Sequence, residues 1–142
     1  MPWTDLLPDP RTILGVYSSA PSLAGFKLEW ISSGPTAVAH EDVRLRGDFA
    51  ALPDPLPPRW SERGYERASV GFSLSGVTEA RVDGVPQIRP NGHAGFEGAP
   101  VDLQIERDGQ SIIVSGTSDY LTFRFVCSDI RAYVEGQQHS SY

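Results

Sequence analysis

Apolar and polar residues alternate along most of the chain from residue 26 onwards. A period of two predicts β-strands with one face turned to a core. The apolar positions of the three clearest strands in the first half are Phe26, Leu28, Trp30, Val43, Leu45, Val70, Phe72 and Leu74. A weaker strand is expected from Val77 to Val82, ending at Asp83-Gly84, a dipeptide that favours a tight turn.

The second half contains the clearest hairpin. Alternating runs over residues 101–106 and 111–115 flank Asp108-Gly109, which predicts a second tight turn. The next strand places its apolar side chains on one face: Leu121, Phe123, Phe125 and Cys127. Because Cys127 shares that face with large apolar residues, we expect a buried, unreactive thiol.

Helical signals are short and lie near the two ends of the chain. Pro10 is suited to the first turn of a helix over residues 11–18. Near the other end, Ser128 or Asp129 is expected to cap one or two helical turns that Gly136 closes.

The pattern as a whole predicts a single domain over residues 1–142, mainly β, built as an antiparallel two-sheet sandwich or a partly open barrel with short terminal helices. Residues 1–22 form a short helical lead-in, and residues 137–142 a frayed tail. Residues 48–67 form a long Pro-rich loop, with four prolines between Pro53 and Pro58 that favour an extended, polyproline-like path. Trp60, which follows them, is suited to anchor this loop to the core.

Composition narrows the function classes. The chain has 142 residues, a single Cys and a formal net charge of −6. One Cys excludes an intramolecular disulfide and Cys-rich zinc modules. The negative charge argues against a nucleic-acid partner, whose phosphates require clustered Lys and Arg. The sequence has neither a signal-peptide pattern nor an apolar run that could span a membrane, so we expect a cytoplasmic protein without a membrane partner.

Motifs of catalysis are missing from the sequence. The glycines in residues 92–98 lack the Lys-Ser/Thr of a phosphate-binding loop, and no serine lies in a nucleophile elbow. We therefore expect no enzyme activity, no catalytic residue, no cofactor and no metal. A metal hydrolase using His40, Asp42 and His93 stays as a minor alternative, provided that those side chains share one coordination sphere.

Several stretches follow the order and spacing of a known family. They are Trp3-Thr4-Asp5-Leu6-Leu7, residues 10–15, Pro21-Ser22-Leu23, the strands near 26–31 and 43–45, the Pro-rich stretch ending at Trp60, and the closing aromatic strand with Ile130 and Tyr133 after it. In this arrangement the chain resembles the immunity protein 50 family of bacterial polymorphic toxin systems. The resemblance implies a small, mainly β protein that binds and neutralises a cognate toxin inside the producing cell. It carries over no catalytic residue.

An acidic inhibitor can be steered towards a basic toxin cleft. We expect the contact surface around the second strand and the Pro-rich loop, with these residues: Glu41, Asp42, Asp48, Asp54 and Trp60. The alternative is a β-sandwich binding module for a small molecule or carbohydrate, with Trp30, Trp60 or Tyr65 as stacking platforms.

Overall fold

The computed structural model describes residues 2–33, 43–84, 87–88, 94–119 and 121–138. Within these ranges the chain is mainly β and antiparallel, as the alternation predicts. One sheet has the strand order β4-β8-β7-β6-β1-β2-β3-β9, with β5 paired to β6. The strands are β1 (Phe26–Ser33), β2 (Val43–Asp48), β3 (Arg67–Ser75), β4 (Glu79–Gly84), β5 (Gln87–Ile88), β6 (Ala94–Asp108), β7 (Ser111–Thr117), β8 (Leu121–Cys127) and β9 (Asp129–Gln137). Across the described residues the sheet is open, with β4 and β9 at its two edges.

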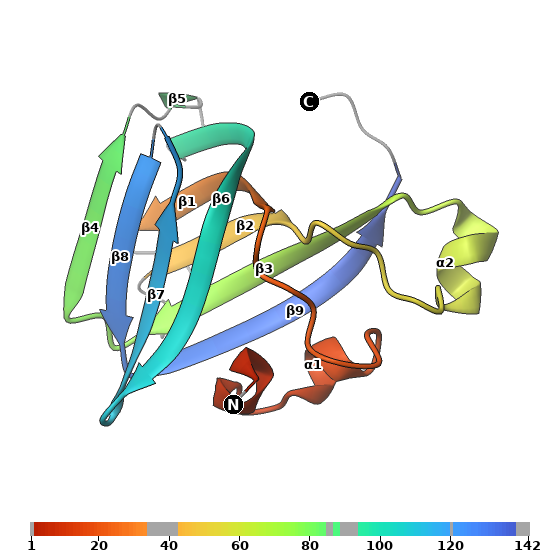
Figure 1. Ribbon diagram of the computed structural model, residues 1–142, viewed down its shortest axis with the longest axis horizontal. Coiled ribbons are helices and arrows are strands. Elements are labelled where there is room, and N and C mark those ends of the chain that lie inside the picture. The colour runs from red at the N-terminus through yellow and green to blue at the C-terminus, as the bar shows by residue number, and fades with distance from the viewer. Residues whose placement is uncertain (1, 34–42, 85–86, 89–93, 120, 139–142) are drawn as a thin grey trace.

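The long strand β6 joins the two halves of the sheet. It has 15 residues. Its first part pairs with β1 and its last part with β7, so the same strand serves both halves. Figure 1 shows β6 bending between β4, β8 and β7 on one side and β1, β2, β3 and β9 on the other. The sheet consequently curves around one set of inward-facing apolar side chains.

The N-terminal segment packs against this core. It contains a 3-10 helix, η1 (Trp3–Leu6), and one short helix, α1 (Arg11–Leu14). The Trp3 ring lies 5.8 Å from that of Phe72 in an edge-on arrangement, and Ile13 of α1 is fully buried. The predicted helix over residues 11–18 is thus present but shorter. In the part of the chain that the structure describes, no helix is long and apolar enough to cross a membrane.

The predicted C-terminal helix is wrong, because its residues form the edge strand β9. This strand pairs with β3 from Asp129 opposite Ser75 to Gln137 opposite Arg67. Its own alternation explains the result, since Ile130 and Ala132 are buried while Arg131 and Tyr133 are exposed. Backbone pairing with β3 outweighed the local capping signals. The predicted frayed tail is described only at its start, where Gln137 ends β9, and residues 139–142 lie outside the described ranges.

The Pro-rich segment between β2 and β3 contains a helix that its prolines concealed. Helix α2 (Pro58–Arg63) begins at a proline, which is tolerated in the first turn, where the missing N–H has no helical partner. Trp60 of α2 is buried, with its ring 5.9 Å from that of Tyr65. This burial confirms the predicted anchor. The tight turn predicted at Asp83-Gly84 is not at these two residues, because they are the last residues of β4.

Candidate functional site

Exposed carboxylates gather on the outward face of the β4-β8-β7-β6 half. Antiparallel partners point to the same side of a sheet, so the register defines the rows. One row runs Glu106, Ile113, Val126, Glu79, and another runs Asp102, Thr117, Thr122, Asp83. We call this surface the acidic face and define it by the exposed carboxylates of Glu79, Asp83, Asp102, Glu106 and Asp108.

The acidic face carries a net negative charge. Among the described residues, two basic side chains, Arg81 and Arg124, share it, which leaves these seven groups a formal charge of −3, against −6 for the whole chain. Arg124 is already engaged, with its Nη1 atom 2.8 Å from Oε2 of Glu79. The remaining charge therefore lies mainly towards β6.

The outward-facing side of β6 is the most uniformly acidic part of this surface. Among the described residues, Asp102, Glu106 and Asp108 make no ion pair. The neighbouring strand β7 turns uncharged side chains to the same face, including Ile113 and Ser115. The Cα atoms of Asp102 and Glu106 lie about 13 Å apart along the strand, at about 3.3 Å per residue. The arrangement presents spaced carboxylates beside a neutral, partly apolar strip, which suits a broad cationic protein surface.

Two of the predicted contact residues are buried. Asp48 is buried, and it accepts hydrogen bonds from Arg67 through both carboxylate oxygens, at 2.8 and 3.3 Å. Trp60 is buried as well, so neither side chain is available to a partner. Asp54 is exposed. Glu41 and Asp42 lie outside the described residues. The candidate surface is therefore revised to the acidic face. Of its carboxylates, the alternation over residues 101–106 places Asp102 and Glu106 on the polar side of β6.

Most charged side chains on the outward face of the other half form ion pairs with one another. Three ion pairs lie on β2, β3 and β9, namely Arg46 with Glu135, Arg67 with Asp48, and Arg131 with Asp129. Ser69 lies in the same row as Asp48 and Glu135, and its Oγ atom is buried without a hydrogen-bond partner. The first two pairs join different strands, the third lies within β9, and each pair offsets its own charges.

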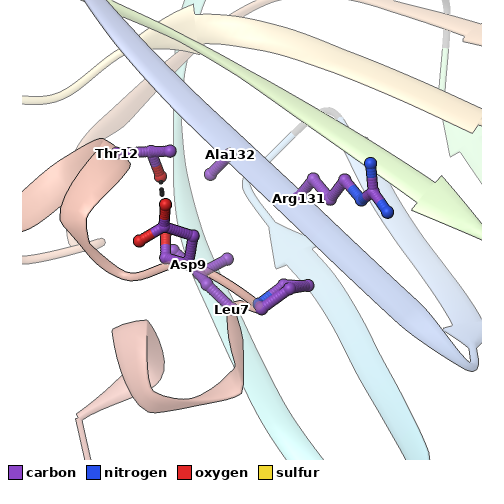
Figure 2. Close-up of a pocket in the computed structure, with 6 residues that line it drawn as sticks. Leu7, Asp9, Thr12, Arg131 and Ala132 are labelled. Carbon is purple, nitrogen blue, oxygen red and sulfur yellow. Dashed lines mark hydrogen bonds between the residues drawn. The ribbon is translucent and has the colours of Figure 1, made fainter.

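A small pocket lies between the N-terminal segment and β9 (Figure 2). Its volume is about 230 Å³, and its lining is Leu7, Pro8, Asp9, Thr12, Arg131 and Ala132. The Thr12 hydroxyl donates to the Asp9 carbonyl at 3.0 Å, and Arg11 Nε donates to the Asp9 carboxylate at 2.9 Å. This hydrogen bond from Arg11 lowers the pKa of Asp9. Figure 2 shows Arg131 extending to the other side of β9. Because the pocket is below the usual range of roughly 300 to 1,000 Å³ and its polar groups bind each other, it does not favour a ligand.

The other predicted sites are distributed as follows. Trp60 and Tyr65 pack on each other, and the ring of Tyr65 fills the space beside Gly136, which gives both a structural role. The predicted core-facing position of Trp30 is wrong, because a register shift between Leu28 and Trp30 turns Ile31 to the core instead. Trp30 is half-buried on the outward face of β1, in one row with Arg46. His40, Asp42 and His93 of the alternative metal site all lie outside the described residues. Within the described ranges no three His, Cys, Asp or Glu side chains are grouped as metal ligands would be.

The cysteine lies in the core, as predicted. Cys127 is buried on the inward face of β8, and its thiol donates to the carbonyl of Ile112 at 3.5 Å. Burial raises the pKa of Cys127 to about 11, with a further contribution from Asp129. The thiolate form is disfavoured at neutral pH, so the residue is unsuited to nucleophilic chemistry.

Comparisons of the chain with protein-family models, with curated proteins and with solved structures find no match.

Proposed function

We propose that this protein is an immunity protein, which binds a cognate toxin inside the producing cell and neutralises it through the acidic face. The observation that carries the proposal is the row of carboxylates along β6, at Asp102, Glu106 and Asp108, which make no ion pair with the described residues and lie beside the uncharged outward side of β7. The resemblance of the chain to the immunity protein 50 family supports the same class of function.

The charge distribution gives this proposal a physical mechanism. Toxins that act on nucleic acids need cationic clefts, because phosphate contacts supply much of their affinity. An inhibitor with a concentrated negative field is drawn to such a cleft faster than a neutral protein would be. Ile113 and Val126, which lie between the carboxylates of Glu106 and Glu79, add apolar area that loses water on docking. Occupation of the cleft then blocks the toxin's substrate.

Charge reversal on β6 tests the proposal. The proposal expects the adjacent upstream gene to encode a protein that ends in a toxin domain. That domain is the probe, and the measurement is its association rate with this protein at low and high salt. Asp102→Lys combined with Glu106→Lys should slow association on the order of tenfold at low ionic strength, and the difference should shrink as salt screens the charges. The same pair of substitutions should reduce protection of cells that express the toxin.

A matched control has the same change in net charge elsewhere. Asp54 and Glu62 are exposed in the Pro-rich segment and in α2. Asp54→Lys combined with Glu62→Lys should leave the association rate within about twofold, since local field rather than total charge governs steering. The proposal fails if the toxin domain does not bind the unaltered protein. A loss of rate in the control pair alone would instead locate the contact at the Pro-rich segment.

A further inference from the structure

The edge strand β4 is the most exposed strand of the sheet. All six of its residues are exposed, and β8 is its only pairing partner among the described strands. Figure 1 shows it at one margin of the sheet. An edge strand of this kind has one row of backbone N–H and C=O groups without a sheet partner and can accept another strand.

One apolar side chain of β4 is also uncovered. Val82 lies opposite Phe123 and therefore on the core side of the sheet, yet it is 42% exposed. Among the large apolar side chains that the structure describes, this exposure is the highest. The apolar layer of the core thus reaches the sheet edge, where the described residues leave Val82 partly uncovered.

The opposite edge of the sheet is different. The N-terminal segment lies along β9, where α1 packs against it and Leu7 and Pro8 approach Ala132. Natural proteins commonly protect edge strands by covering them with a helix or loop. Of the two edges, β4 is the one that no described element covers.

The sequence of β4 is complementary to itself in two antiparallel registers, and only the one centred on Val82 also pairs the exposed apolar side chains. A register centred on Ala80 places Glu79 opposite Arg81 but leaves Val82 opposite Thr78. If Val82 lies opposite Val82 of a second copy, Arg81 lies opposite Asp83 on both sides of the two-fold axis. Each Val82 then covers the other, and opposite charges meet twice. Centring on Arg81 instead places Arg81 opposite itself and Glu79 opposite Asp83. Registers centred between two residues place charged side chains opposite apolar ones.

We propose that two copies of this chain associate through antiparallel pairing of their β4 strands, in the register that places Val82 opposite Val82 and Arg81 opposite Asp83. The sheet then continues across the two-fold axis. Because paired strands keep their outward sides together, the acidic faces of both copies lie on the same side of the assembly. The proposal does not depend on the toxin-binding function, since it concerns the purified protein alone.

Sedimentation of the purified full chain tests the proposal. Between about 10 μM and 1 mM, the mass should rise from the 15.5 kDa of one chain towards twice that value. Arg81→Asp places two carboxylates opposite each other at both charged pairs, and Asp83→Arg places two guanidinium groups there. Each single substitution should raise the dissociation constant on the order of tenfold or more. The two substitutions together exchange the charges and should restore association.

The controls separate this edge from the rest of the acidic face. Asp102→Arg makes the same charge change as Asp83→Arg on the same face, but on β6, and it should leave the dissociation constant unchanged. Far-UV circular dichroism checks that each variant is folded, and a failure of one single variant leaves the other to carry the test. A chain that stays monomeric throughout this concentration range overturns the proposal. So does a dimer that neither single substitution weakens, or one that the double exchange does not restore.

Discussion

The ion pair between Asp48 and Arg67 should contribute far more to stability than the exposed ion pairs of this protein. Their side chains are 10% and 16% exposed, and two hydrogen bonds join the guanidinium to the carboxylate. Asp48→Ala leaves the Arg67 charge without this counterion in a place where water reaches it poorly. Loss of one partner of a buried pair typically costs about 3 to 5 kcal/mol. Because both side chains keep some contact with solvent, we expect the lower end, about 3 kcal/mol.

The free energy of unfolding of each variant is measured with urea at pH 7, using circular dichroism as the signal. The variants are compared with the same dependence of that free energy on urea concentration. The matched control is Glu79→Ala, which breaks the ion pair with Arg124 between β4 and β8. Those side chains are 46% and 44% exposed, so the loss should stay within about 1 kcal/mol. Replacing both members of the buried pair, Asp48→Leu with Arg67→Met, should recover most of the loss, since no charge is then left alone.

The reasoning is refuted if Asp48→Ala costs no more than Glu79→Ala, or if the double replacement is as unstable as Asp48→Ala. The result also bears on function. A charge reversal at Asp48 would place two cations together beside the core, so a loss of partner binding in that variant would report unfolding rather than a lost contact.

Two further predictions concern buried polar atoms. Ser69→Ala should raise the free energy of unfolding by about 1 kcal/mol, because it removes a buried hydroxyl that has no hydrogen-bond partner among the described residues. A lower free energy of unfolding in a urea titration would contradict this prediction. Burial raises the pKa of Cys127 from 9.0 to about 11, so the folded state favours the neutral thiol. Its contribution to stability is complete below about pH 9 and is lost as the pH rises towards 11. Cys127→Val should lack this part of the loss of stability at alkaline pH. The prediction is wrong if the stability of this variant falls with pH in the same way as that of the unaltered protein.

The alternation of apolar and polar residues was sufficient to predict many strands of the sheet. Alternation predicted β1, β2, β3, β7 and β8, and the last part of β6, because a strand with one buried face needs apolar residues at every second position. It also predicted the burial of Cys127 from its neighbours on β8. In the same way, the outward positions of β6 were readable as polar before the fold was known.

Other features depended on contacts between distant residues. Residues 129–137 carry both capping signals and an alternation, and only pairing with β3 decides between helix and strand. Asp48 and Asp102 are both carboxylates at outward strand positions, yet Arg67 from the adjacent strand pairs with Asp48, whereas Asp102 makes no ion pair with the described residues.

The sequence by itself determined that the chain folds as an antiparallel β protein, because side-chain period is a local property of the backbone. It also determined an acidic charge balance, but with the carboxylates dispersed along the chain. Only the tertiary structure decided which of them share a surface. Strand order and register bring Glu79 and Asp83 of β4 onto one face with the carboxylates of β6, and they leave β4 at an open edge. Those placements depend on pairing between segments far apart in the chain, which no local pattern encodes.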